Sequence, residues 1–311
     1  MNKHWSQIKE AGGLIGLKFT LWSYRILGRQ ITYLIMYFVM VYYFLIFSNA
    51  RKASFDYIRH IKPNISKFNL WLYSFRHFLS FGRMLIDKFA VWNKRITSED
   101  LIFSKSSKEN LEQAINRKKG GIIFTAHLGN LEVARALSKY NLDIKISALV
   151  FSKNAQKLNK LLTKVNPEFQ IGMISLQQPM PDLAIQLHDK IEAGEFIVIA
   201  GDRTSVTKHE RNLEVNFLGD NAPVPEGAFV LASLLKCPCY FMICPKNDKN
   251  KFDFIFENFA LEGIVFEREN RKEQLIKYAQ EYANRLSHFC NIYPLEWFNF
   301  FDFWNKEKKS V

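Results

Sequence analysis

The stretch GIIFTAHLGNLEVARAL, residues 121–137, decides the fold. Its first half is a short apolar run that predicts a buried β-strand, and its second half repeats apolar residues at the spacing of a helix. The tight Leu-Gly-Asn turn joins the two, with Asn130 in position to cap the helix. A strand followed at once by a helix is the repeating unit of a parallel sheet covered by helices.

The same alternation continues along the chain. Besides Gly121–Ala126, apolar runs predict strands at Ile144–Phe151, Gly172–Leu176, Glu195–Ala200, Tyr240–Ile243 and Phe252–Phe256. Helical patterns are found at Leu131–Lys139, Asn154–Val165, Asp182–Ala193, Glu226–Leu235 and Asn270–Phe289. We therefore expect an α/β fold over residues 66–311, with a mainly parallel mixed sheet flanked by helices.

Residues 1–65 differ from this pattern and are expected to form a membrane-attachment segment. Residues 31–48, ITYLIMYFVMVYYFLIFS, carry no charge over a length close to the ~20 residues of a membrane-spanning helix. Ten Lys or Arg residues but only two carboxylates occur up to Lys67, which is typical of a segment at an anionic membrane surface. Three interpretations are open: a spanning helix, a helix in the membrane interface, and a helix docked on the core. A second aromatic helix, Phe68–Trp92, is expected to cover the membrane-facing side of the domain.

Composition restricts the class of protein. With 48% hydrophobic and 15% aromatic residues over 311 positions, the chain can bury a sizeable core and is neither disordered nor fibrous. The net charge of +13 favours anionic partners, and its clustering beside the apolar segment favours lipid over nucleic acid. The four cysteines have no C-x-x-C spacing and no histidine at zinc-ligand distance, so we expect no metal site and a reducing, cytoplasmic-facing core.

His127 follows the first strand, at the rim of the sheet where open α/β folds bind ligands. Glu132 comes five residues later, in the first helical turn, where a carboxylate is also stabilised by the helix dipole. The turn can fold this carboxylate back onto the imidazole, hold its tautomer and stabilise the imidazolium that forms when His127 accepts a proton. Such a pair deprotonates a hydroxyl directly. The alternative is a structural histidine beside an unrelated helix-start glutamate.

Two further segments bring polar groups toward the same rim. The strand FIVIAGDRT, residues 196–204, ends in Asp202 and Arg203, and the guanidinium suits a phosphate or a developing oxyanion unless the segment forms only a strand-end salt bridge. The segment FLGDNAPVPEGAFVLASLL, residues 217–235, turns through two prolines into a helix beginning at Glu226 and Gly227. The N–H groups there can bind an anion or simply begin a helix. Together with Asn130, these four residues form the predicted substrate-binding set.

These motifs resemble those of a known family. TAHLGNLE, residues 125–132, is similar to the His-x4-Glu block of the lysophospholipid acyltransferase superfamily. The order of apolar strand, GDR, VNFLG-x-x-A-x-V-P-E-G, LA-x-LL and CP resembles its lipid A lauroyl/myristoyl acyltransferase branch. The basic and aromatic N-terminal helix, FSKNAQKLNKLLTKVNP and the tail WFNFFDFW look closer still to predicted acyltransferases of aryl-polyene and related lipid pathways. The resemblance covers nearly the whole chain.

The resemblance implies that His127 is a general base, that Glu132 is its partner, and that Arg203 is an anion-binding or transition-state residue on the acyl-donor side. It also implies an acyl carrier protein or coenzyme A thioester as co-substrate, with no cofactor or metal. P-E-G at 225–227 matches part of the acceptor-site block of glycerolipid acyltransferases. Val224 replaces the usual Phe of that block and no T-R-S follows, which argues against a glycerol-phosphate acceptor.

The sequence thus predicts an EC 2.3.1-type acyltransferase on the cytoplasmic face of a bacterial inner membrane, acting on a hydroxyl of a lipid or glycolipid. Its expected partners are membrane lipid, an acyl carrier protein and the acceptor, and not nucleic acid. Two alternatives are an acyl thioesterase, in which water replaces the acceptor, and a non-catalytic basic lipid-binding protein. In the second alternative His127, Glu132 and Arg203 would share no cleft.

Overall fold

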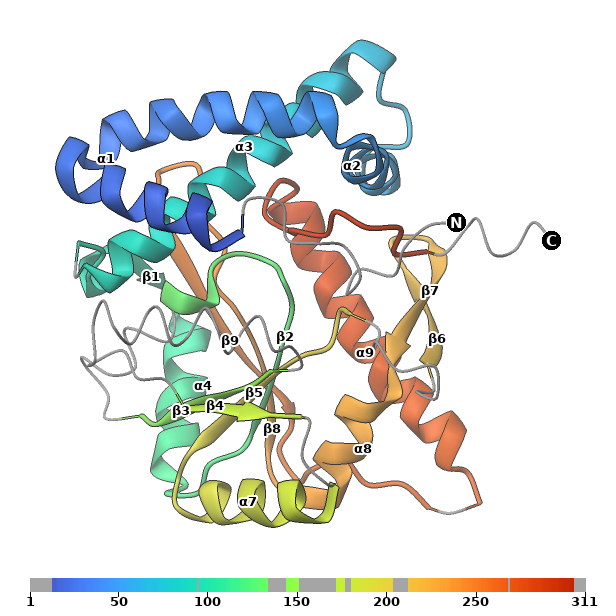
Figure 1. The fold of residues 1–311 in the computed structure, drawn as a ribbon. Coiled ribbons are helices and arrows are strands. Elements are labelled where there is room, and N and C mark those ends of the chain that lie inside the picture. The colour runs from blue at the N-terminus through green and yellow to red at the C-terminus, as the bar shows by residue number, and fades with distance from the viewer. Residues whose placement is uncertain are drawn as a thin grey trace.

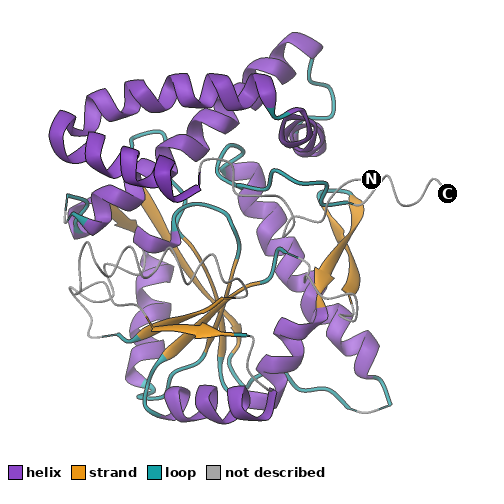
Figure 2. Cartoon of the chain, viewed as in Figure 1, coloured by secondary structure: helices purple, strands orange, loops and turns teal. Residues whose placement is uncertain are grey.

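The computed structural model describes residues 13–93, 95–133, 144–150, 172–176, 180–203, 212–267 and 269–304. A central sheet has helices on both faces, and three N-terminal helices lie across one end of it (Figure 1, Figure 2). The α/β fold class predicted from the alternating pattern is confirmed.

The central sheet has seven strands in the order β1-β9-β8-β2-β5-β3-β4. They are β1 (Leu101–Phe103), β2 (Ile122–Thr125), β3 (Ile146–Val150), β4 (Gly172–Ser175), β5 (Phe196–Ala200), β8 (Cys239–Ile243) and β9 (Phe252–Ala260). Neighbouring strands are parallel except β8 and β9, which are antiparallel. The register pairs Thr125 of β2 with Ala200 of β5. Because both strands run in the same direction, the residues that follow them meet at one edge of the sheet.

The pleat of the strands divides the interior into two hydrophobic cores, since successive side chains point to opposite faces. Ile122 and Phe124 face a core shared with α7 (Met180–Glu192), α8 (Glu226–Leu235) and α9 (Arg271–Ile292). Ile123 faces the other core, which contains residues of α4 (Lys105–Asn116) and the N-terminal helices. All four residues of β2 are buried, as expected for a strand covered by helices on both faces.

The N-terminal layer consists of α1 (Gly13–Ile46), α2 (Ser48–Ile61) and α3 (Lys67–Trp92). Gly28 breaks the helical geometry of α1, with a φ of 77°. Of the apolar run expected at residues 31–48, residues 31–46 therefore form the second half of α1, and the run crosses a sharp break at Phe47 to Ser48, the first residue of α2. No single helix in the described ranges is long and apolar enough to cross a membrane. Gln30–Ile46 and Ser48–Ile61 pass that test only as a pair, bent by 92°.

The structure differs from the expectation in the region after β5. The segment around Pro223 and Pro225, expected as a turn, is the strand β7 (Asp220–Pro225), which pairs antiparallel with β6 (Asn212–Phe217). Proline is tolerated because both strands of a two-stranded ribbon are edge strands. The elements β1 and α4 were not predicted from the sequence. The helix predicted at Asn154–Val165 and most of the helix at Leu131–Lys139 lie outside the described residues.

Candidate active site

His127 lies just beyond the end of β2, whose last residue is Thr125. The strand end is held by α9, because the Tyr282 hydroxyl donates to the Thr125 carbonyl oxygen at 2.9 Å. Gly129 has a φ of 80°, and a Cβ there would lie 2.2 Å from the Cys244 carbonyl oxygen, so the turn requires glycine. The His127 side chain keeps 36% of its surface exposed. The base candidate is thus fixed by its backbone and open to a substrate.

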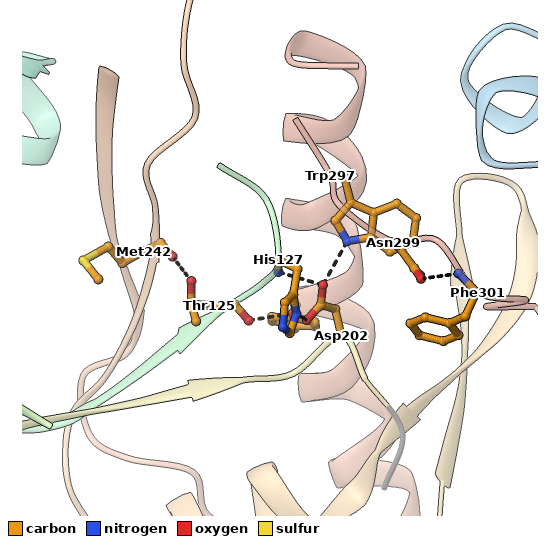
Figure 3. A network of polar contacts seen from close by, with 8 residues as sticks. Thr125, His127, Asp202, Met242, Trp297, Asn299 and Phe301 are labelled. Atoms are coloured by element: carbon orange, nitrogen blue, oxygen red, sulfur yellow. Dashed lines mark hydrogen bonds and ion pairs between the residues drawn. The ribbon is translucent and has the colours of Figure 1, made fainter. Parts of the chain in front are cut away.

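The carboxylate that holds His127 is Asp202, which follows β5 (Figure 3). Asp202 Oδ1 lies 2.8 Å from His127 Nδ1. Its Oδ2 accepts from the His127 backbone N–H at 2.8 Å and from the Trp297 indole N–H at 2.9 Å. Because an ionised carboxylate only accepts hydrogen bonds, Nδ1 carries the proton and Nε2 carries the lone pair. This is the tautomer in which Nε2 can act as a base.

Burial and the charge of Arg203 keep the imidazole neutral, and the neighbouring groups keep the carboxylate ionised. Burial lowers the pKa of His127 below its usual value, the positive charge of Arg203 lowers it further, and Asp202 opposes both. Burial alone would raise the pKa of Asp202. The charge and hydrogen bond of His127, with Arg203, outweigh that and lower the pKa of Asp202 to about 2. At neutral pH, His127 is therefore a neutral imidazole and Asp202 is an anion.

Arg203 comes directly after Asp202, and its charge acts on both members of the pair. The centre of its guanidinium lies 6.0 Å from the centre of the Phe301 ring, within the range of a cation–π contact. The structure therefore brings Arg203 to the same rim as His127, as the two strand ends predicted. A base and a cation in one site fit a reaction in which a proton leaves and an anion develops.

Glu132 is half-buried in the helical turn at residues 131–133. From the sequence, this carboxylate was predicted to hold the imidazole tautomer, and Asp202 was predicted to bind substrate. In the structure Asp202 makes the bond to Nδ1. A protonated ring nitrogen donates one in-plane hydrogen bond, so Glu132 cannot hold the tautomer through the same atom. The catalytic role of Glu132 stays a prediction.

Asn130 lines a polar cavity of about 800 Å³ between α3, the β8–β9 turn and the end of α9. Its charged and hydroxyl-bearing lining includes Tyr73, Arg76, Ser80, Arg83, Asp87, Lys246, Asp248, Asp253, Tyr293 and Glu296. Asn130 is buried, its amide nitrogen lies 3.4 Å from the Met84 carbonyl oxygen, and its Oδ1 has no partner among the described residues. Charges of both signs line this cavity, which suits a polar ligand.

Among the described residues, the contacts of Glu226 and Gly227, the residues predicted at the start of a helix, do not include His127 or Asp202. The carboxylate of Glu226 pairs with Arg271 of α9 at 3.3 Å. A Cβ at Gly227 would have no atom within 4 Å, so no close approach explains this glycine. The acceptor-binding role of Glu226 and Gly227 stays a prediction.

The sequence reading gave no role to Trp297, although the tail containing it was part of the resemblance. Its bond to Asp202 joins residues 95 positions apart, and no local pattern predicts such a contact. The one available signal is chemical, because a buried tryptophan needs an acceptor for its N–H.

Within the described part of the chain, no group of three or more His, Cys, Asp or Glu side chains is arranged to hold a metal ion. The four cysteines are buried and unbridged. The residues gathered at His127 offer acid–base chemistry and a positive charge.

Comparison with known proteins adds a family to this geometry. Residues 75–260 match the family model described as bacterial lipid A biosynthesis acyltransferase. The matched region includes His127, Glu132, Asp202 and Arg203, whereas Trp297 lies outside it. No curated protein matches the chain.

Proposed function

Because the chain belongs to the bacterial lipid A biosynthesis acyltransferase family, we propose that it transfers a fatty acyl group from an acyl thioester to a hydroxyl of a lipid or glycolipid. One observation carries the proposal. Buried Asp202 holds Nδ1–H of a partly exposed His127, and Arg203 lies beside the pair. A base held in this way can activate a hydroxyl directly, with no nucleophilic Ser or Cys.

The proposed reaction begins when His127 Nε2 removes the proton of the acceptor hydroxyl. The oxygen attacks the thioester carbonyl carbon, and Arg203 stabilises the negative charge of the tetrahedral intermediate. Asp202 stabilises the imidazolium that forms in this step. The C–S bond then breaks, the ester remains on the acceptor, and the leaving thiolate takes the proton back from His127. Glu132 acts in this scheme as a second carboxylate, whose negative charge stabilises the imidazolium.

Membrane association on the cytoplasmic face of the inner membrane is part of the proposal. One side of α1, and the start of α3, expose large apolar side chains: Trp22, Ile26, Ile31, Leu34, Tyr37, Phe38, Tyr42, Leu45, Ile46, Phe68, Trp71 and Leu72. The opposite side of α1, with Met36, Met40 and Phe44, is buried in the core. Many large apolar side chains exposed on one helix are typical of an interaction site, and a helix of this kind can lie in a membrane interface.

The partners follow from charge and polarity. The net charge of +13 suits an acidic acyl carrier protein, with coenzyme A thioesters as the other donor class. We propose that the cavity beside Asn130 binds a polar part of the acceptor, because charged and amide side chains line much of it. Glu226 and Gly227 are proposed to bind the acceptor at a separate point. The reaction needs no cofactor beyond the thioester co-substrate.

The test is an acyl-transfer assay on the full chain reconstituted in vesicles of bacterial inner-membrane lipid. Acyl carrier protein and coenzyme A thioesters are supplied separately, and acylated lipid and free fatty acid are both quantified by mass spectrometry. Acylated lipid that depends on His127 is the expected result. Free fatty acid alone, again dependent on His127, would establish the thioesterase instead. Neither product with any donor would refute an acyl-thioester enzyme.

A further inference from the structure

We propose that Trp297 is a positioning residue of this active centre, and that the C-terminal segment after α9 completes a site whose other members lie within residues 75–260. The inference rests on the proposed function for its catalytic consequence. Its structural content, the control of Asp202 and His127 by an indole N–H, is independent of the reaction.

The orientation of the Asp202 carboxylate is set by its hydrogen-bond donors. A carboxylate can rotate about its Cβ–Cγ bond, and it directs an oxygen at His127 Nδ1 only when its plane is correctly oriented. Trp297 Nε1 and the His127 backbone N–H both donate to Oδ2, at 2.9 and 2.8 Å. These two donors leave Oδ1 to face the imidazole at 2.8 Å. The indole N–H therefore selects the productive orientation of the carboxylate (Figure 3).

The indole of Trp297 is itself held by packing. Trp297 is fully buried. Aromatic rings from three different parts of the chain surround it, with centroid distances of 4.9 Å to Tyr57, 5.1 Å to Phe217 and 5.1 Å to Phe303. Packing on several sides prevents the ring from turning its N–H away from Asp202.

The backbone of the same segment also bonds to the loop that carries His127. Leu128 and Trp297 form an antiparallel bridge. The Gly129 N–H donates to the Glu296 carbonyl oxygen at 2.8 Å, and the Phe298 N–H donates to the His127 carbonyl oxygen at 2.7 Å. The C-terminal segment thus pairs directly with the loop that carries His127, so the base and the indole that orients its carboxylate are held in one unit.

The consequence can be stated for the N–H alone. Without it, Asp202 loses one of the three donors around its charge and becomes a stronger base, while the two bonds to His127 remain. More negative charge then faces the imidazole, so the pKa of His127 rises. The carboxylate is also less firmly oriented, so kcat falls about tenfold or more, which corresponds to about 1.4 kcal/mol in the barrier. Trp297 is not expected to touch substrate, so KM stays within about twofold.

The experiment compares Trp297→Phe with the matched control Trp304→Phe in the full chain. Trp304 is also buried in the tail, but its Nε1 donates to the Phe217 carbonyl oxygen at 3.2 Å. His127 is titrated by NMR of labelled imidazoles and assigned from the spectrum of His127→Ala. This readout needs no substrate, so it can fail or succeed separately from the proposed function.

The expected result is a raised His127 pKa and a reduced kcat in Trp297→Phe, with neither change in Trp304→Phe. An unchanged His127 titration in Trp297→Phe would overturn the inference, as would equal changes in both variants, which would indicate general packing. If Trp297→Phe fails to fold, 3-benzothienylalanine at position 297 keeps the shape of the ring and removes only the N–H. The same two outcomes then decide.

Discussion

His77 Nε2 and the Trp297 carbonyl oxygen lie 2.9 Å apart, which joins α3 to the C-terminal segment at a fully buried position. Because a carbonyl only accepts, Nε2 carries the proton and Nδ1 accepts from the Ser54 hydroxyl at 3.0 Å. Ser54 in turn accepts from Ser74 at 2.8 Å. This chain of donors requires a neutral imidazole, and it ties α2 and α3 to the residue that orients Asp202.

A first prediction follows for stability. Burial lowers the pKa of His77 to about 4, against the smaller opposing effect of its bond to Trp297. In the unfolded chain His77 has a pKa of about 6.5, so between pH 6.5 and pH 4 the unfolded chain binds the proton more readily than the folded one. The contribution of neutral His77 to stability is therefore fully present above pH 6.5 and is lost as the pH falls toward 4. We expect a loss of about 3 kcal/mol over this window, by linkage. His77→Gln keeps a donor and an acceptor but cannot titrate.

Denaturant unfolding of wild type and His77→Gln from pH 8 to pH 4 measures this effect. The difference between the two stabilities should be constant above pH 6.5 and should shrink on acidification. The exposed His288→Gln serves as the control. Parallel pH curves for wild type and His77→Gln would show that His77 is not held neutral.

The second prediction concerns the base. His127→Ala should reduce acyl transfer by about 10² to 10⁴, the range for removing a general base, and should leave the fold intact because the side chain is partly exposed. His288→Ala, on the outer side of α9, should retain wild-type turnover. Transfer by folded His127→Ala above roughly a tenth of the wild-type rate would exclude His127 as the base, since that loss falls short of the range.

The third prediction separates the two carboxylates. Asp202→Asn places an amide opposite Nδ1, removes the charge that stabilises the imidazolium, and should lower turnover about 10²-fold or more. Glu132→Gln should do the same if Glu132 takes part in the reaction, whereas a helix-dipole role would cost only about 0.3 to 1 kcal/mol of stability and little activity. Each variant is measured alone and with His127→Ala. Residues that act as one unit with the base should add little to the loss caused by His127→Ala. If the loss in the double variant equals the product of the two single losses, that carboxylate does not act together with His127.

The parts of this site that were predictable from sequence are those encoded by local pattern. His127 and Arg203 each follow an apolar run, so the end of a strand predicted their position at the rim. Asp202 was recognised as a rim residue, but its bond to His127 depends on the register of β2 against β5, which no periodicity encodes. The contact between Trp297 and Asp202 depends on the path of the chain after α9, which no local pattern encodes. The β6–β7 ribbon was not predicted, because the prolines of β7 are typical of turns.

The fourth prediction is the pH dependence of kcat/KM, which reports groups of the free enzyme. Burial first, and then Arg203, lower the pKa of His127, so the base stays neutral below its usual value near 6.5. The acid limb of the profile should therefore have its midpoint below pH 6.5. Arg203→Gln removes a positive charge that favours the neutral ring, so the midpoint of the acid limb should move to higher pH. The rate should also fall. An acid limb that does not move in Arg203→Gln would mean that Arg203 does not act on His127.

The fifth prediction tests membrane attachment at single positions rather than by truncation. Phe38 on α1 and Ile185 on α7 are both 63% exposed, so a charge at either position is compatible with the fold. If the exposed side of α1 lies in the membrane interface, Phe38→Glu loses the burial of a phenyl ring, worth about 1.5 to 3 kcal/mol, and repels anionic lipid. Its binding to phosphatidylglycerol-containing vesicles should weaken by about 10-fold or more, whereas Ile185→Glu should bind like wild type. Flotation of the full chain with vesicles at physiological salt provides the measurement, with thermal unfolding to verify that both variants fold. Equal binding of Phe38→Glu and Ile185→Glu would exclude this part of α1 from the attachment surface. A wild-type chain that stays entirely in the soluble fraction would refute attachment altogether.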